Sequence, residues 1–428
     1  MRLGGRVAAA IEILQSIADT RRPVSDVLRD WGNAHRFAGS GDRAAIGNLV
    51  YDALRKRAST AWLMDDDAPA ALAFGTIWRQ WGHGIEDLRA AFDGDAHAPE
   101  LPVLPLESAA KRDLAEAPDH IRADVPEWTS ELLEGNFDEE WVAEGAALSE
   151  RPPLDLRVNT LRAERDKVAR ALVKAGAKPT RIARQGLRIA PGQGPSRLPN
   201  VRAEPGYQKG WFEIQDEGSQ IVSDLVFARP GEQVFDLCAG AGGKTLALAA
   251  AMDNKGQVHA YDADKNRLAP IFERLRRAGT RNVQVHAADE DLTPLQGRFD
   301  RVLVDAPCTG SGTWRRHPDA KWRLSEDQLE QRTAEQAELL DHAVTFVRPG
   351  GFLCYVTCSV FAEENEVQVY DLMERNAAME LVSAGEAWQD LFGFDKPQPW
   401  SADLNCITLT PRSTDTDGFF FAVLQRRS

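Results

Sequence analysis

Residues 232–245 read EQVFDLCAGAGGKT, and this stretch decides the fold of the C-terminal half of the chain. An apolar run that ends at Asp236 gives way to Gly240, Gly242 and Gly243, and then to a helical segment rich in alanine and leucine. This order predicts a strand, a tight glycine turn and the start of a helix. Glycines let the backbone approach a bound group, and the first helical amides point N–H donors at it. We therefore expect a ligand at this turn.

Three classes of ligand compete for the turn. A Walker phosphate loop needs a glycine five residues before Gly243, where the chain has Cys238, although Lys244 and Thr245 fit that pattern. A dinucleotide fingerprint that starts at Gly240 needs a glycine at position 245, which is a threonine. The remaining common ligand is S-adenosylmethionine. A P-loop NTPase is kept as the alternative enzyme class.

From residue 232 onward, apolar runs alternate with helical patterns across short turns, which predicts an α/β fold with a doubly wound, Rossmann-like parallel sheet. Such sheets bind ligands at the carboxyl ends of their strands. Asp262 follows the second strand, 19 residues after Gly243, where nucleoside-binding folds place an acid on the ribose hydroxyls. The predicted strands are followed by, or end at, Asp236, Asp262, Asp289, Asp305 and Cys358.

The chain is long enough for two or three domains. Residues 1–149 carry helical periodicity and predict an all-helical domain, with a proline-rich linker at residues 98–105. Residues 150–215 change to short strand and helix patterns and predict a small α+β domain. Residues 216–428 form the third predicted domain, which contains the glycine turn and the parallel sheet.

Charge is distributed unevenly along the chain. The net charge is −14, yet residues 151–210 hold 14 lysines and arginines against 4 acidic residues, whereas residues 61–150 hold 5 against 21. A basic segment of this kind is either a solvated face or a surface that follows RNA phosphates. The candidate RNA contacts are Arg157, Lys167, Arg170, Lys174 and Arg181.

The composition is that of a globular protein, with 43% hydrophobic and 27% charged residues. We expect a cytoplasmic monomer, because no apolar run is long enough to span a membrane and no signal peptide is evident. The five cysteines include no Cys-x-x-Cys pair, and the eight histidines have no ligand spacing, so we predict neither disulfides nor a metal site.

Two cysteine motifs point to the chemistry. Cys308 lies in DAPCTGSG, residues 305–312, and Cys358 lies in VTCS, residues 356–359. Both follow strand ends in polar turns, whereas Cys354 lies inside a predicted strand and reads as a small buried hydrophobe. Thiols suit a pyrimidine reaction, because carbon 5 of cytosine becomes nucleophilic only after a thiolate adds to carbon 6.

These motifs together resemble the RsmB-like (Sun) family of RNA cytosine-5 methyltransferases. The resemblance rests on DLCA with GGKT at residues 236–245, on DAPC with RRHPD at residues 305–319, and on TCS with EEN at residues 357–365. One departure is that Gly240-Ala241 stands where the family commonly has Ala-Pro. Residues 41–55 resemble, more weakly, the NusB-like helical domain that precedes some of these enzymes.

The resemblance implies a role for each matching residue. Cys358 would attack carbon 6 of the cytosine, Cys308 would help to release the product, and Asp305 would hydrogen-bond the flipped base. The expected substrate is RNA, with 16S ribosomal RNA the expected species. S-adenosyl-L-methionine would be held by Cys238, Ala239, Gly240, Ala241, Gly242, Gly243, Lys244, Asp262, Asp289 and Asp305.

A second alternative is a non-enzymatic RNA-binding assembly factor with a vestigial core. It gives no physical reason for two thiols and an aspartate at strand ends.

Lys244 is the motif residue that could help Cys358 to ionise, since a free thiol has a pKa of about 8.5.

Overall fold

The computed structural model describes residues 1–428 and divides the chain into two compact units. We call them the helical unit, which comprises Met1–Pro152, Pro191–Leu198 and Trp314–Leu324, and the sheet unit, which comprises Pro153–Ala190, Pro199–Thr313 and Ser325–Ser428. The short segment Trp314–Leu324 thus belongs to the helical unit although it follows the Cys308 motif directly in sequence.

The helical unit has one hydrophobic core, built from the apolar stripes of its helices. Ile13, Leu14, Ile46, Leu49 and Val50 are buried there, which confirms the helical periodicity of the N-terminal segments. The helices are α1 (Leu3–Thr20), α2 (Val24–Ala34), α3 (Ser40–Arg55), α4 (Arg57–Met64), α5 (Pro69–Arg79), α6 (Ile85–Phe92), α7 (Val103–Ala109), α8 (Asp119–Ala123), α9 (Ser130–Phe137), α10 (Trp141–Ala147) and α17 (Pro318–Arg323), with short 3-10 turns η1 (Leu114–Glu116), η2 (Glu127–Thr129) and η3 (Asp138–Glu140).

One expectation for this unit is wrong. The proline-rich stretch at residues 98–105 is not linker throughout, because α7 begins at Val103. Pro105 is the third residue of that helix, and a proline in the first turn leaves no helical hydrogen bond unmade.

The sheet unit contains a small antiparallel sheet of four strands in the order β2-β3-β1-β4. Strands β1 and β3 fall within the short strand patterns expected for residues 150–215, and β4 lies in the sequence YQKGWFEIQ at residues 207–215. Phe212 of β4 is buried in the core of this sheet, so it is a packing residue. The elements are β1 (Leu154–Val158), β2 (Lys178–Pro179), β3 (Gly186–Ile189) and β4 (Phe212–Ile214), with α11 (Arg165–Ala171), η4 (Val173–Ala175), η5 (Val201–Ala203) and α12 (Pro205–Gln208).

The large sheet has the order β10-β12-β9-β8-β5-β6-β7, with β11 paired to β12. Strands β5 to β9 are parallel, which confirms the predicted doubly wound sheet, whereas β10, β11 and β12 add an antiparallel edge that the sequence reading missed. The strands are β5 (Gln233–Asp236), β6 (Gln257–Ala260), β7 (Val283–Val285), β8 (Phe299–Asp305), β9 (Val347–Thr357), β10 (Met379–Val382), β11 (Ile407–Leu409) and β12 (Phe419–Arg426).

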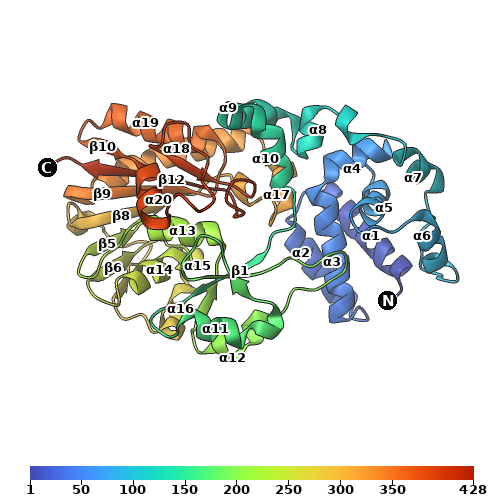
Figure 1. Cartoon of the computed structure of the whole chain (residues 1–428), viewed down its shortest axis with the longest axis horizontal. Helices are drawn as coiled ribbons and strands as arrows, with labels where there is room; N and C mark the ends of the chain where they lie inside the picture. Colours follow the sequence, from blue (N-terminus) through green and yellow to red (C-terminus); the bar gives the residue numbers. More distant parts are fainter. The chain divides into compact units, whose positions relative to one another are not determined.

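Helices cover both faces of the large sheet (Figure 1). Successive strand residues point to opposite faces, so Val234 packs with α13, α14 and α20 on one side and Phe235 packs with α18 and α19 on the other. The helices are α13 (Glu217–Leu225), α14 (Gly243–Ala251), α15 (Lys265–Leu268), α16 (Ile271–Ala278), α18 (Glu326–Val344), α19 (Glu366–Arg375) and α20 (Ala384–Phe392), with the turns η6 (Thr293–Leu295), η7 (Ser311–Thr313) and η8 (Ala362–Glu364).

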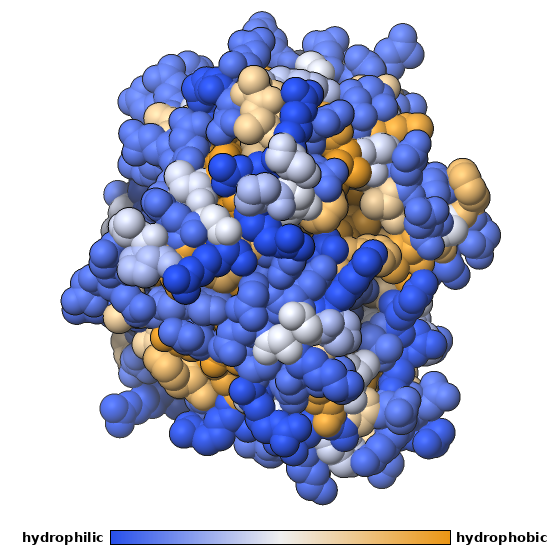
Figure 2. All heavy atoms as spheres, turned by 90° about the vertical axis from the view of Figure 1, so that its left-hand side faces the viewer, coloured by the Kyte–Doolittle hydropathy of each residue, from blue (hydrophilic) through white to orange (hydrophobic).

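The surface at the left of Figure 1 is mostly hydrophilic, with hydrophobic residues gathered in a few places (Figure 2). None of the helices combines the length and the hydropathy needed to cross a lipid bilayer.

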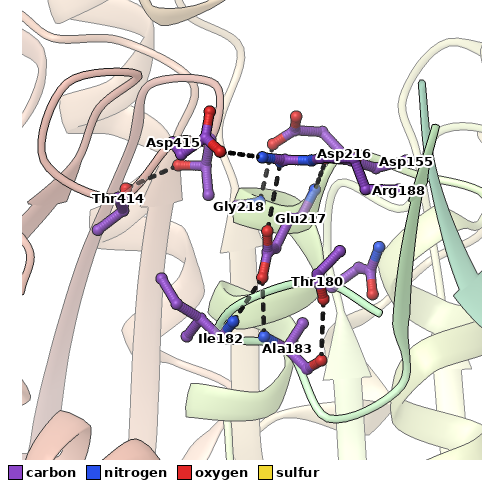
Figure 3. Close-up of polar contacts among 12 residues, drawn as sticks. Asp155, Thr180, Ile182, Ala183, Arg188, Asp216, Glu217, Gly218, Thr414 and Asp415 are labelled. Carbon is purple, nitrogen blue, oxygen red and sulfur yellow. Dashed lines mark hydrogen bonds and ion pairs between the residues drawn. The ribbon is translucent and has the colours of Figure 1, made fainter. Parts of the chain in front are cut away.

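An ion cluster links the small sheet to α13 and to the loop before β12 (Figure 3). Arg188 of β3 pairs with Asp155 of β1, with Glu217 at the start of α13 and with Asp415 of the loop before β12. The Glu217 carboxylate also accepts the backbone N–H groups of Ile182 and Ala183. Three carboxylates around one guanidinium therefore fix the small sheet against α13 within this unit.

Candidate active site

The glycine turn between β5 and α14 has the shape that its sequence predicts. Gly240 and Gly242 have positive φ angles of 50° and 81°. A Cβ atom on Gly242 would lie 2.5 Å from Cγ1 of Ile271, so only glycine fits at this position. The turn therefore brings bare backbone to the carboxyl edge of the sheet, directly before the first turn of α14.

Asp262 lies beside this turn, as the spacing predicted. It is 4% exposed, and one carboxylate oxygen accepts the Gly240 N–H at 2.9 Å while the other accepts the Asp264 N–H at 2.8 Å. A carboxylate oxygen can accept two hydrogen bonds, so each oxygen keeps one acceptor position for a hydroxyl. The geometry suits a ribose diol held against the glycine turn.

Asp289 follows β7 and is exposed. It lines a cavity of about 720 Å³ whose walls include Leu268, Phe272 and Val285. Most of the lining is aliphatic or aromatic, with Lys265, His286 and Asp289 as its ionisable residues, and such a cavity suits a flat heteroaromatic ring. Asp262 and Asp289 thus flank the ends of adjacent strands β6 and β7.

Two residues of the turn are structural in character. Asp236 is fully buried, accepts the Thr245 hydroxyl at 2.6 Å, and has its pKa raised to about 7 by burial. Burial also raises the pKa of the Cys238 thiol well above its ordinary value, with the Asp236 and Asp305 carboxylates acting in the same direction. Cys238 is therefore protonated at neutral pH and is unsuited to nucleophilic attack.

The two cysteines singled out by the sequence meet at the ends of β8 and β9. The sulfur of Cys308 lies 3.4 Å from that of Cys358, and both residues are free cysteines of intermediate exposure. The hydrogen bond to Cys358 and burial raise the pKa of Cys308 well above its ordinary value. Cys308 therefore keeps its proton and can donate it toward the Cys358 sulfur. Cys354 is fully buried inside β9, which confirms its reading as a core residue.

Lys244 and Asp305 form the second polar pair at this edge. The Lys244 ammonium donates to Asp305 Oδ2 at 2.6 Å and lies 5.2 Å from the centre of the Phe419 ring. The sequence reading offered Lys244 as the group that assists Cys358, whereas here its charge is directed at Asp305. Oδ1 of Asp305 has no hydrogen bond within the chain and remains available to a ligand.

Glu364 holds the Cys308 loop from beneath, a role that the sequence reading did not assign. Its fully buried carboxylate accepts the Thr309 N–H at 2.8 Å, the Thr309 hydroxyl at 2.5 Å and the Gln336 amide at 3.0 Å. Gln336 also donates to the carbonyl of Pro307 at 2.9 Å. The sequence did carry a signal for this support. Gln336 is a polar residue in helical register with Leu329 and Leu340, on the buried face of α18.

Comparisons with known proteins agree with this geometry. The model of the family "16S rRNA methyltransferase RsmB/F" matches residues 225–425, and the model of the RsmF/B-like ferredoxin-like domain matches residues 125–193. A ribosomal RNA small subunit methyltransferase B from Erwinia tasmaniensis is 34% identical over 308 residues, and one from Escherichia coli is 33% identical over 307. Each alignment covers 71% of this chain and spans 66% of the relative's own length.

Solved structures show the same architecture. The crystal structure of PH0851 superposes with a TM-score of 0.74 at 25% identity and covers the whole of both chains. A methyltransferase homologue from Pyrococcus horikoshii gives a TM-score of 0.59 at 27% identity, covering 72% of this chain and 97% of its own. The likeness to PH0851 therefore covers the residues of both units of the chain.

Proposed function

Since the chain belongs to the RsmB/F family of S-adenosylmethionine-dependent methyltransferases, we propose that it methylates carbon 5 of a cytosine in 16S ribosomal RNA. The observation that carries the proposal is the thiol pair, with the Cys308 and Cys358 sulfur atoms 3.4 Å apart at the ends of adjacent parallel strands. A methyltransferase acting on an oxygen or an amino nitrogen has no need of such a pair.

The residues at the carboxyl edge fit S-adenosylmethionine, which supplies the methyl group when bound. The glycine turn would take its amino acid part, Asp262 would accept the ribose hydroxyls, and the cavity beside Asp289 would take the adenine ring. Asp262→Ala should weaken cofactor binding by roughly 1–3 kcal/mol, because the ribose hydroxyls lose their acceptor. Calorimetry measures this directly, and unchanged affinity would remove Asp262 from the site.

The reaction uses the two thiols in sequence. The Cys358 sulfur, once it has lost its proton, would form a bond to carbon 6, and the ring electrons would move to carbon 5, which would take the methyl group and leave S-adenosylhomocysteine. Asp305 would hydrogen-bond the cytosine through Oδ1 while Lys244 holds Oδ2, and so would favour protonation of ring nitrogen 3. Loss of the proton on carbon 5 then returns the electron pair and breaks the carbon–sulfur bond. Cys308 lies against Cys358 and would assist this release.

The proposal is tested by methylating an unmodified 16S ribosomal RNA transcript with cofactor that carries a tritium-labelled methyl group. We expect tritium in the RNA and one cytosine that resists bisulfite, because 5-methylcytosine is not deaminated. Tritium without a bisulfite-resistant cytosine would place the methyl group on another atom. Absence of tritium in ribosomal RNA and its presence in another RNA would overturn the substrate.

A further inference from the structure

Arg157 of β1 is a buried cation that forms no salt bridge, although the Glu213 and Asp224 carboxylates act on it at longer range. Arg157 is only 6% exposed. Its one side-chain hydrogen bond is donated by Nε to Gln215 Oε1 at 2.6 Å. Glu213, its cross-strand partner on β4, is engaged by Arg274 and Arg277. Burial lowers the pKa of Arg157 to about 10, which still leaves it charged at neutral pH.

Arg188, on the neighbouring strand β3, is paired very differently from Arg157. Arg188 has three carboxylates around it, from Asp155, Glu217 and Asp415 (Figure 3). Arg157 has none within ion-pair distance, and both of its Nη groups lack protein acceptors. Desolvation of a guanidinium is costly when its carboxylates lie beyond ion-pair distance, so an acceptor from outside the chain that enters the cavity would relieve the cost.

Arg157 lines a cavity of about 330 Å³ within the sheet unit. Arg184 and Arg229 line it as well, and both are exposed at its margin. Asp224 is the one acid in the lining. Three guanidinium groups against one carboxyl give the cavity a positive charge, and a guanidinium fork matches the oxygen atoms of a phosphate.

Asp224 does not prevent an anion from binding. Burial raises the pKa of this carboxyl to about 6, and only the charges of Arg157 and Arg184 oppose that rise. A bound anion would pair with the Arg157 and Arg184 guanidinium groups and so raise the pKa of Asp224 further. The Asp224 carboxyl would then bind a proton and could donate a hydrogen bond to the anion.

The rest of the cavity is apolar. Ala247, Ala250 and Ala251 of α14 form one wall, and Phe227 forms another. Phe227 has a φ of 59°, a strained left-handed conformation for a bulky residue, and its ring stays 38% exposed with the Arg229 guanidinium 5.7 Å from its centre. An exposed aromatic face beside a cationic pocket suits a ring that is attached to a phosphate.

We propose that this cavity binds a nucleotide, with the phosphate on Arg157 and the base against Phe227. The nucleotide is either free or one unit of an RNA strand. The site is separate from the glycine turn and the thiol pair, whose residues do not line it. The inference therefore does not depend on the methyl-transfer reaction, and it is tested without the cofactor.

Calorimetry with cytidine monophosphate, inorganic phosphate and cytidine tests the proposal. We expect the monophosphate to bind, phosphate to bind more weakly and cytidine not to bind measurably. Arg157→Met should abolish binding, and Arg184→Ala, which changes an exposed residue and leaves the core intact, should weaken it about tenfold. Asp224→Asn should strengthen it at neutral pH. Arg181→Ala removes the same charge from the same segment outside the cavity and should change nothing.

The two sources are separated by competition. If an RNA oligonucleotide displaces the monophosphate and Arg184→Ala weakens RNA binding by the same factor, the nucleotide belongs to an RNA strand. If RNA binding ignores the variant, the ligand is a free nucleotide. No binding of the monophosphate up to about 10 mM, a range that covers weak ligands, would overturn the proposal. Equal affinity of Arg184→Ala and the unchanged protein would do the same.

Discussion

The thiol pair owes its geometry to single residues that tie the loops after β8 and β9 together. The Gly312 N–H donates to the carbonyl of Cys358 at 3.0 Å, and the Ser311 and Ser359 hydroxyls are hydrogen-bonded at 2.9 Å. A Cβ atom on Gly312 would lie 2.3 Å from the carbonyl oxygen of Gly418, so this position also requires glycine. The two loops are thus held together by backbone and hydroxyl contacts in addition to the contact between the sulfur atoms.

The buried carboxyl of Asp236 should make the free energy of unfolding depend on pH. Its pKa is about 7 in the fold and about 3.9 in the unfolded chain. Between these values the folded state keeps a proton that the unfolded state has lost, so this group lowers the free energy of unfolding as pH rises from about 4 to about 7, by at most about 1.4 kcal/mol per pH unit. Asp236→Asn should remove this loss.

Urea denaturation at pH 5 and pH 8 measures the effect. The stability of Asp236→Asn relative to the unchanged protein should be higher at pH 8 than at pH 5. Asp371→Asn, on the exposed side of α19, is the matched control and should show no such change. An identical pH response of Asp236→Asn and the unchanged protein would contradict the assignment.

At the scale of elements, α18 and η8 support the loop that carries Cys308. Gln336 comes from α18 and Glu364 from η8, and together they hold Pro307 and Thr309 on either side of the cysteine. The support therefore comes from elements that are distant in sequence from the loop they fix.

Glu364→Ala should slow methyl transfer and lower stability by roughly 1–3 kcal/mol, because buried donors on Thr309 and Gln336 lose their acceptor. Thermal unfolding and the initial rate of methylation measure the two effects. Glu374→Ala, an exposed residue of α19, is the control. A variant that loses stability yet methylates at the normal rate would show that the loop does not need this support.

Strand ends were predictable from sequence, but the contacts among them were not. The apolar periodicity placed Asp262, Asp305 and Cys358 correctly, because parallel strands deliver their carboxyl ends to one edge. The pairing of Lys244 with Asp305 joins residues 61 positions apart and depends on helix packing that periodicity does not encode. In the missed antiparallel edge, β10 and β11 are only four and three residues long and show no clear period, whereas the eight residues of β12 begin with an apolar run that was a usable strand signal.

For the whole molecule, the structure revises which charges could meet RNA. Arg157 is buried and lines a cavity, so it does not belong to an exposed basic face that follows RNA phosphates. Lys167, Arg170, Lys174 and Arg181 are exposed, and Lys167 lies 4.1 Å from the centre of the Trp211 ring. Charge alone cannot separate these cases, because a buried arginine on a strand and an exposed one on a helix look alike in composition.

Replacing these four exposed residues by glutamate should reduce the dependence of RNA affinity on salt, because each neutralised phosphate contributes to the slope. Filter binding at several salt concentrations measures the slope. Arg375→Glu, on α19, is the control for a change of charge elsewhere. An unchanged slope in the fourfold variant would make the basic segment an ordinary solvated face.

The structural unit to which the segment Trp314–Leu324 belongs could not be predicted from the sequence. It contains most of the motif quoted with Cys308, yet Lys321 is fully buried within the helical unit and donates to the carbonyl of Arg55 and the hydroxyl of Ser149. Burial lowers the pKa of Lys321 to about 7. Sequence order assigned the segment to the methyltransferase domain, and only its packing places it among the helices.

The division of labour between the two thiols is the central claim, and trapping of the covalent intermediate tests it most directly. Labelled RNA and S-adenosylmethionine are incubated with each variant and run on a denaturing gel. Cys358→Ser should give neither methylation nor adduct, because a serine hydroxyl is a far weaker nucleophile at neutral pH. Cys308→Ser should attack and methylate but remain joined to the RNA. An adduct in Cys358→Ser and none in Cys308→Ser would reverse the assignment, and methylation by both variants without any adduct would contradict the covalent mechanism.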